Sequence, residues 1–207
     1  MKSLTTFIAL AMAAIPFASK AQSESTENVL ALTFLHPGIS YEMKTARYQT
    51  LHLSAYMGLN ASFSSSSNMG DDFNLYFDPA ITAQYRFYYN FEKRLNKNTR
   101  TAKNSANYFA VEAGTTFSKM RMKSFYYEED SRRPVNNIAV LWGMQRNMPG
   151  RFSLNFSAGL GFVWTQASYP GDGGTIGQET YSKLNIPVNL GLGIWLGKTE
   201  KKQNFNP

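Results

Sequence analysis

The sequence predicts an all-β protein, a single antiparallel up-and-down transmembrane β-barrel of about eight strands. Long stretches alternate apolar with small or polar residues at a period of two. This period is typical of a strand with one apolar and one polar face. The stretches also exceed the ~5 to 6 residues usual in soluble sheets and reach the ~9 to 11 that a tilted strand needs to cross a bilayer.

The two clearest stretches are residues 151–165 and 183–197. Their other faces carry mostly Ser, Asn and Gly, which suits the interior of a narrow barrel. The apolar faces consist of Phe152, Leu154, Phe156, Ala158, Leu160, Phe162 and Trp164 in the first stretch, and Leu184, Ile186, Val188, Leu190, Leu192, Ile194 and Leu196 in the second.

Five further stretches have the same period: residues 39–45, 50–63, 77–92, 107–118 and 138–144. That makes seven strands, whereas single-chain bacterial barrels use an even number. We therefore expect residues 27–35, before His36-Pro37-Gly38, to supply the eighth. One kinked first strand through Pro37 is the alternative, so the sequence leaves open whether residues 27–45 form one strand or two. Pro187 cannot donate to a ladder, and we expect it above the bilayer or at a bulge.

The connections alternate in character. Residues 64–74, 124–135 and 167–180 are long and rich in Ser, Gly or acids, whereas the turns at 46–49 and 148–150 are short. Outer-membrane barrels have long outer loops and short periplasmic turns. We therefore expect the three long connections to face outward. The basic connection at residues 95–106 then lies on the periplasmic side with both termini.

The N-terminus reads as an export signal. Lys2 precedes an apolar run over residues 4–17, and Ser19 and Ala21 supply the small residues before a cut. We expect a signal peptide at residues 1–21 and a barrel domain at 22–207. Losing Lys2 and Lys20 lowers the formal net charge from +7 to +5.

Composition excludes several classes of protein. The chain has no cysteine, which excludes a lipid-anchored N-terminal cysteine, disulfides and thiolate metal sites. The mean hydropathy is −0.34 and, beyond the signal, no run of 18 apolar residues remains, which excludes helical spans. The basic residues form no nucleic-acid-binding motif, and an exported protein would not meet nucleic acid, so we expect no nucleic-acid partner.

Charged residues on the inward faces predict an interior charge network. A charge enclosed in a narrow barrel must be paired, because a buried unpaired charge costs several kcal/mol. Eight strands enclose a lumen of roughly 8 Å backbone radius, which side chains fill. We expect Arg86 to be shared between Glu42 and Glu112. The whole inward polar set is Glu42, Lys44, Gln84, Arg86, Glu92 and Glu112.

Catalytic, metal and cofactor sites are not expected. His52-Leu53-Ser54 puts a base and a hydroxyl on one strand face, and Glu112 could orient the base as an acyl-transfer enzyme requires. The spacing resembles the His-x-Ser of barrel-type lipid A deacylases. Ala55 replaces the polar residue that should follow, and a hydrogen-bonded interior histidine is the favoured interpretation. The acid clusters at residues 71–72, 128–130 and 172 lack the spacing of a Ca²⁺ loop.

The last predicted strand contains a pattern that resembles an assembly signal. Asn189, Gly191, Ile194 and Leu196 resemble the polar-x-Gly-x-x-hydrophobic-x-hydrophobic pattern that the outer-membrane assembly machinery recognises. Leu196 stands in place of the usual aromatic residue, and the chain continues to Pro207.

The whole mature chain resembles the small outer-membrane β-barrel proteins of Gram-negative bacteria. Residues 85–114, a strand, a basic turn and a strand, and the opening HPGISYEMK at residues 36–44 carry the resemblance. It implies a cell-envelope protein in contact with membrane lipid and lipopolysaccharide, the assembly machinery, and a surface or periplasmic protein partner. It transfers no catalytic residue. We expect a structural or surface-interaction role; the alternatives are a narrow pore or transporter, or a lipid A-modifying enzyme.

Overall fold

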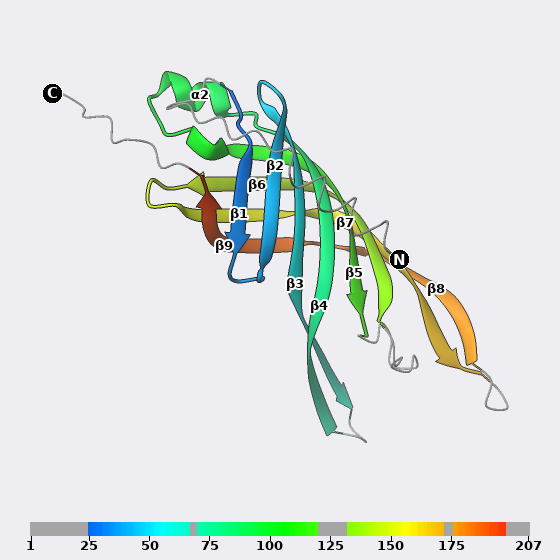
Figure 1. Cartoon of the computed structure of the whole chain (residues 1–207). Helices are drawn as coiled ribbons and strands as arrows, with labels where there is room; N and C mark the ends of the chain where they lie inside the picture. The colour runs from blue at the N-terminus through cyan, green and yellow to red at the C-terminus, as the bar shows by residue number, and fades with distance from the viewer. Residues whose placement is uncertain (1–24, 67–69, 120–131, 172–175, 198–207) are drawn as a thin grey trace, which may run out of the picture.

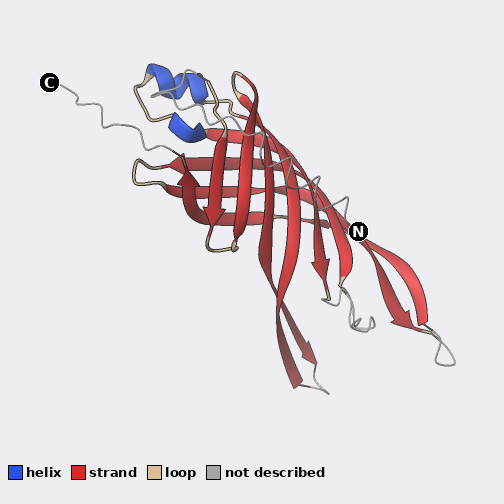
Figure 2. Ribbon diagram, viewed as in Figure 1, coloured by secondary structure: helices blue, strands red, loops and turns tan. Residues whose placement is uncertain are grey.

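The computed structural model describes residues 25–66, 70–119, 132–171 and 176–197. The predicted signal peptide and most of the 124–135 connection lie outside these residues. Nine strands and two short helical segments make up the described chain (Figures 1 and 2). They are β1 Val29–Thr33, β2 Gly38–Ala46, β3 Gln49–Ser66, β4 Gly70–Phe87, α2 Phe91–Asn96, η1 Ala102–Asn104, β5 Asn107–Ser118, β6 Arg133–Asn147, β7 Phe152–Pro170, β8 Ile176–Asn185 and β9 Val188–Leu196.

The strands form one antiparallel sheet that closes into a barrel-like ring of eight. Each strand from β1 to β7 pairs with the next, and β9 pairs with both β7 and β1. β8 and β9 pair with successive parts of the same strand, β7, so together they occupy one position in the ring. The predicted all-β fold is confirmed, and residues 27–45 supply two strands, β1 and β2.

Pro187 divides the last strand. The predicted continuous strand over residues 183–197 is wrong at Ile186 and Pro187, which separate β8 from β9. The break is not a bulge, because Asn185 pairs with Gly161 and Val188 with Ala158, three residues apart on each strand. The Pro187 carbonyl accepts the Gly159 N–H at 3.1 Å, and proline has no N–H to return.

Two of the predicted long loops are mostly strand. Residues 64–66 and 70–74 extend the β3–β4 hairpin, with Ser66 opposite Gly70, and residues 167–170 and 176–180 extend the β7–β8 hairpin, with Pro170 opposite Ile176. The alternation of side chains fades there, but a ladder of backbone hydrogen bonds does not depend on it.

The predicted strand at residues 77–92 extends too far at its C-terminal end. β4 ends at Phe87, and α2 begins at Phe91. The Tyr88 N–H donates to the Tyr48 carbonyl, and the Phe91 N–H then turns back to the Tyr88 carbonyl. Glu92, expected inside the barrel, is exposed on α2. The basic connection therefore folds into helical segments across one end of the ring, here called the near end.

The register gives the tilt and width of the ring. A row of paired residues that starts at Leu30 passes through Tyr41, Leu53, Ala83, Ala113, Ile138 and Phe162 to Leu184. Leu30 itself pairs with Leu196 on the other side, so closure shifts the register by 12 residues (196 less 184). For eight strands this shift implies a tilt of ~45° and a backbone radius of ~9 Å.

The outward face forms an apolar belt bounded by aromatic residues. β4, β5 and β7 each expose an aromatic ring at both ends of the belt, and the exposed residues between them include Ile81, Val111 and Leu160. Ten residues separate Phe87 from Phe77, a height of ~23 Å at this tilt. The aromatic pairs are Phe87 and Phe77, Phe109 and Phe117, and Phe152 and Trp164.

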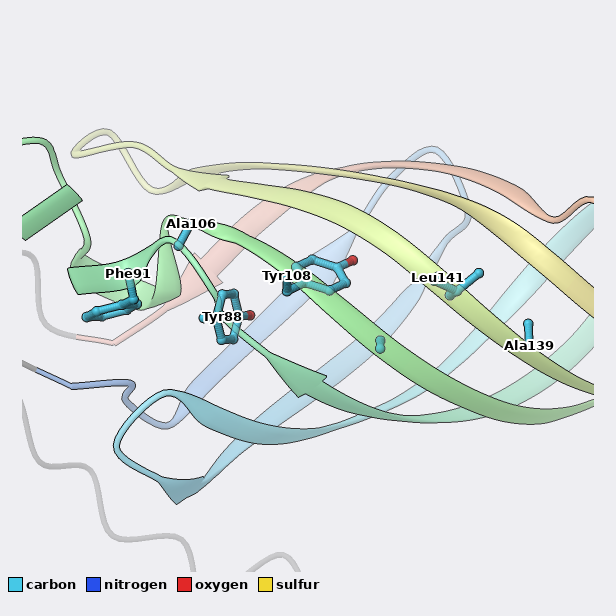
Figure 3. Packing of buried hydrophobic residues seen from close by; sticks show 7 residues of the cluster. Tyr88, Phe91, Ala106, Tyr108, Ala139 and Leu141 are labelled. Atoms are coloured by element: carbon cyan, nitrogen blue, oxygen red, sulfur yellow. The ribbon is translucent and has the colours of Figure 1, made fainter. Parts of the chain in front are cut away.

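A small apolar cluster lies inside the ring at the near end. Tyr88, Phe91 and Tyr108 are almost completely buried and pack with Leu141 and small alanines (Figure 3). The rings of Tyr88 and Tyr108 meet edge to face, with centroids 5.5 Å apart. Above this cluster, toward the tips of the long hairpins, the inward face is mostly polar.

Candidate functional site: the lumen of the ring

Glu42 is the centre of a buried polar network. Its Oε1 accepts hydrogen bonds from Tyr88 and, at 2.6 Å, from Thr50 Oγ1. Its Oε2 accepts Gln145 Nε2 at 3.0 Å and lies 3.9 Å from Arg86 Nη1. Burial, and the neighbouring Glu42 carboxylate, raise the pKa of Tyr88 well above its ordinary value. Tyr88 therefore stays protonated and donates to Glu42.

Arg86 holds this network together. It is 1% exposed, and its guanidinium donates from Nε to Gln84 Oε1 and from Nη1 to Gln145 Oε1, each at 2.7 Å. The guanidinium also lies over the Tyr108 ring, 4.5 Å from its centroid, a cation–π arrangement. The charge is thus compensated by one carboxylate, two amides and one ring.

Glu112 joins the network only through an amide. Gln84 Nε2 donates to Glu112 Oε2 at 2.6 Å, and Asn137 Nδ2 donates to Oε1 at 2.9 Å. The structure thus brings Arg86 beside Glu42, and the Gln84 side chain connects Arg86 to Glu112. We call Glu42, Gln84, Arg86, Gln145, Tyr88 and Tyr108 the floor.

A second layer below the floor closes the near end. Lys103 of η1 is buried inside the ring, with Nζ 2.7 Å from Glu27 Oε2. Asn104 clamps the Glu27 backbone: its Oδ1 accepts the Glu27 N–H at 2.8 Å, and its Nδ2 donates to the Glu27 carbonyl at 2.9 Å. The Lys103 carbonyl accepts the side-chain amides of Asn147 and Gln145.

This layer is not predicted by the sequence pattern. Lys103 and Asn104 have φ angles of 54° and 61°, so the chain enters the ring through two consecutive left-handed residues. Asn tolerates this conformation better than most residues. Lys103-Asn104-Ser105 is a polar run in a basic connection, a pattern typical of solvated turns, and only this backbone conformation places it inside.

A cavity of about 310 Å³ lies above the floor. Its lower wall includes Glu42, Gln84 and Arg86, and its upper wall includes His36 and Tyr56. Side chains therefore do not fill the ring along its whole length. The larger register shift gives a radius of ~9 Å rather than the expected ~8 Å, which explains part of this space.

His52 and Ser54 both line the cavity. Ser54 Oγ forms a hydrogen bond with Thr82 Oγ1 at 2.6 Å. His52 pairs across the sheet with Glu42 on one side and Gln84 on the other. Within the described residues, no hydrogen bond joins His52 to Ser54, and the Nδ1 atom of His52 is buried without a partner.

The four residues of the predicted assembly signal lie on β9. Asn189 and Gly191 line the cavity, whereas Ile194 and Leu196 belong to the other, outward face. Asn189 Nδ2 reaches Ser157 Oγ at 3.5 Å. Lys44, expected inside the ring, is exposed at the end of β2 and donates to Ser25 Oγ at 2.8 Å.

The described residues contain no cluster of three or more His, Asp or Glu side chains that could hold a metal ion. The acids at residues 128–130 and 172 lie outside the described chain, and the side chains at 71 and 72 are not described. In the part of the chain that the structure describes, no helix is both long and apolar enough to span a membrane.

Comparison with known proteins gives no family: no protein-family model, curated protein or solved structure matches this chain.

Proposed function

We propose that this chain is an integral outer-membrane β-barrel protein with a structural or surface-interaction role. The observation that carries the proposal is the outward apolar belt, ~23 Å tall between two sets of exposed aromatic rings, because transmembrane barrels have an apolar band of ~25 Å flanked by aromatic girdles. Exposing so many Phe, Leu, Ile and Val side chains to water would be unfavourable for a soluble protein.

The orientation follows from the connections. The near end carries α2, η1 and the short turns, whereas the β3–β4 and β7–β8 hairpins project from the opposite end (Figure 1). In our proposal the near end faces the periplasm, and the long hairpins face lipopolysaccharide and surface partners. A periplasmic protein partner would meet α2, which exposes Glu92 and Lys93.

Membrane insertion is tested by expressing the full chain in a Gram-negative host and separating the two membranes on a density gradient. We expect the protein in the outer-membrane fraction and expect it to resist extraction by urea or carbonate. Its intact mass should be that of a chain that begins at Gln22. Recovery in the soluble periplasm would refute the membrane proposal, and retention of Met1 would refute export by a cleaved signal.

A narrow pore is the second candidate, and the cavity is the observation that favours it. Against it, the floor and the layer around Lys103 place buried, mutually bonded side chains across the lumen at the near end. We therefore rank conduction below a closed barrel. A lipid A-modifying enzyme ranks third, since Ser54 is bonded to Thr82 rather than to a base.

A further inference from the structure

The wall of the ring is incomplete above the β1–β2 hairpin. β2 begins at Gly38, opposite Tyr56, with one further backbone bond from Met57 N to Pro37 O, although β3 continues to Ser66. On the other side β1 ends opposite Gly193, with one further backbone bond from Phe34 N to Leu192 O. Beyond these points the facing edges of β3 and β8–β9 have no neighbouring strand among the described residues. We call this gap the window; Figure 1 shows the hairpin ending far short of β3 and β4.

The window lies within the apolar belt. The row through Gly38 and Tyr56 reaches β4 at Ala80, three residues (80 less 77) short of the aromatic Phe77. At a tilt of ~45°, three residues along a strand rise ~7 Å, and each of the two steps from β2 to β3 and from β3 to β4 rises ~3.4 Å. The hairpin tip therefore lies ~14 Å below Phe77, near the middle of the belt, and the two missing strands leave β3 and the last strand ~14 Å apart.

The window and the floor share one cavity. Thr33, His36 and Tyr56 at the rim line the same space as Gln84 and Arg86 at the bottom. A volume of about 310 Å³ is at the lower end of the range for small-molecule sites. In a bilayer, an unpaired strand edge is tolerated only where it lines a polar cavity. The placement of the window beside the cavity meets this requirement.

The cavity suits an uncharged, hydrogen-bonding group. Arg86 is already engaged by Glu42, Gln84 and Gln145, so it is not free to bind an anion. Glu112 has amide donors and no cation within the described network, which adds a negative field. The remaining lining is rich in hydroxyl and amide side chains: Ser40, Ser54, Thr82, Thr116, Ser153, Asn155, Ser157 and Asn189.

The rim of the window is apolar on its outward side. Phe34 and Leu35 at the hairpin tip are about half exposed, and Leu184 and Ile186 on the last strand are 83% and 72% exposed. These side chains provide a surface along which an alkyl chain can lie. A gap of ~14 Å between strand axes admits one such chain while its polar end remains in the lumen.

We propose that the lumen binds a single-chain amphiphile with an uncharged, hydroxyl-bearing headgroup, which enters from the membrane through the window and leaves its alkyl chain there. This inference rests on the proposed membrane-spanning function. The headgroup lies against Ser54, Thr82 and Asn189, and the chain passes between the hairpin tip and Ile186.

Binding is tested with the full mature chain in phosphatidylcholine nanodiscs, with 1-monolauroylglycerol as the probe and native mass spectrometry as the readout. We expect one bound probe per protein, and at least tenfold weaker binding of dodecyl sulfate, which carries the same chain on an anion. Ser54→Trp should fill the cavity and weaken binding at least tenfold. Its matched control, Ala55→Trp, puts the same ring on the outward face and should bind as the wild type does.

The route is tested by single cysteines, since the chain has none of its own. A maleimide on a lauroyl glycerol scaffold, dissolved in the bilayer, should label Ser54→Cys and the outward control Leu53→Cys, but not Thr50→Cys, which is fully buried beside Glu42. Flotation with the vesicles confirms insertion in each case. Two results would overturn the inference alone: a Ser54→Cys variant that floats with the vesicles but is labelled no faster than Thr50→Cys, or a Ser54→Trp variant that binds the probe as tightly as the wild type does. A protein that fails to float with the vesicles would overturn the proposed function.

Discussion

Arg86 is the residue on which the charge balance of the floor depends. Its guanidinium is the partner of Glu42 and holds Gln84 and Gln145 in place. Removing one partner of a buried pair leaves an uncompensated charge, which costs much more than the net gain from the pair. The floor should therefore be sensitive to this side chain and insensitive to exposed lysines.

Arg86→Ala should lower the free energy of unfolding by ~3–5 kcal/mol, measured by urea titration in detergent micelles. The control Lys93→Ala, on the exposed side of α2, should change it by less than ~0.5 kcal/mol. Adding Glu42→Gln to Arg86→Ala should recover part of the loss, because the two groups interact. A loss below ~1 kcal/mol for Arg86→Ala would contradict the assigned role.

Asn104 is the second residue whose role can be isolated. Asn104→Ala removes both hydrogen bonds to the buried Glu27 backbone and places alanine at a φ of 61°, so we expect a loss of ~2–4 kcal/mol. Asn104→Gly loses the same bonds without the steric cost and should be more stable than the alanine variant by ~1 kcal/mol. Thermal unfolding on semi-native gels measures both. Equal stability of the two variants would show that the left-handed backbone has no energetic role.

At the scale of elements, β9 combines the closure of the ring with the predicted assembly signal. Leu196 and Leu30 are paired across the seam and share its outward face. Their depths therefore differ by only ~3 Å and their surroundings are similar, but only Leu196 belongs to the predicted signal. This pair separates recognition by the assembly machinery from the simple cost of a charge in the membrane.

Leu196→Asp should prevent assembly in cells, whereas Leu30→Asp should be tolerated, because a charge near the interface costs only ~1 kcal/mol. Heat-modifiable migration of outer-membrane extracts reports assembly. Equal amounts of assembled Leu196→Asp and Leu30→Asp would mean that the resemblance to the signal has no function here.

The strands were largely predictable because each buries one face. β5 begins and ends at the predicted residues, since both its alternation and its pairing stop there. Three features were not predictable. The hairpin extensions of β3–β4 depend on backbone pairing rather than on side-chain pattern, and Pro187 interrupts a strand without shifting its register. The position of Lys103 inside the ring depends on the left-handed backbone conformation of Lys103 and Asn104, which the hydrophobic periodicity does not predict.

For the whole molecule, the register shift of 12 residues and the short β1–β2 hairpin matter most. The register shift is not visible in the sequence, because it arises from which residues pair across strands, whereas the stretch at residues 39–45 already predicted that β2 is short. The interior charges were predictable by type, since inward positions follow from the period of two. Of their partners, Arg86 was expected beside Glu42, whereas Lys103 was not expected inside the ring, because it comes from a connection whose fold the alternation does not describe.

A barrel closed at its near end should not conduct. In planar bilayers the wild type should give no steady conductance under conditions in which an open porin does, because the floor and the Lys103 layer block the lumen. A stable channel of porin size would move the pore to first place among the proposed functions.

The claim that the ring spans a bilayer is tested most directly by a single-cysteine scan of β4 from Phe77 to Phe87. Each cysteine carries a nitroxide, and the protein is reconstituted in vesicles. We predict that the collision rate of the nitroxide with oxygen alternates with a period of two: it should be high at odd-numbered positions and lowest at Arg86 and Gln84. Among the odd positions, depth should be greatest near Ile81 and Ala83. Free collision of a water-soluble nickel chelate with the nitroxide at Ile81 would contradict the account.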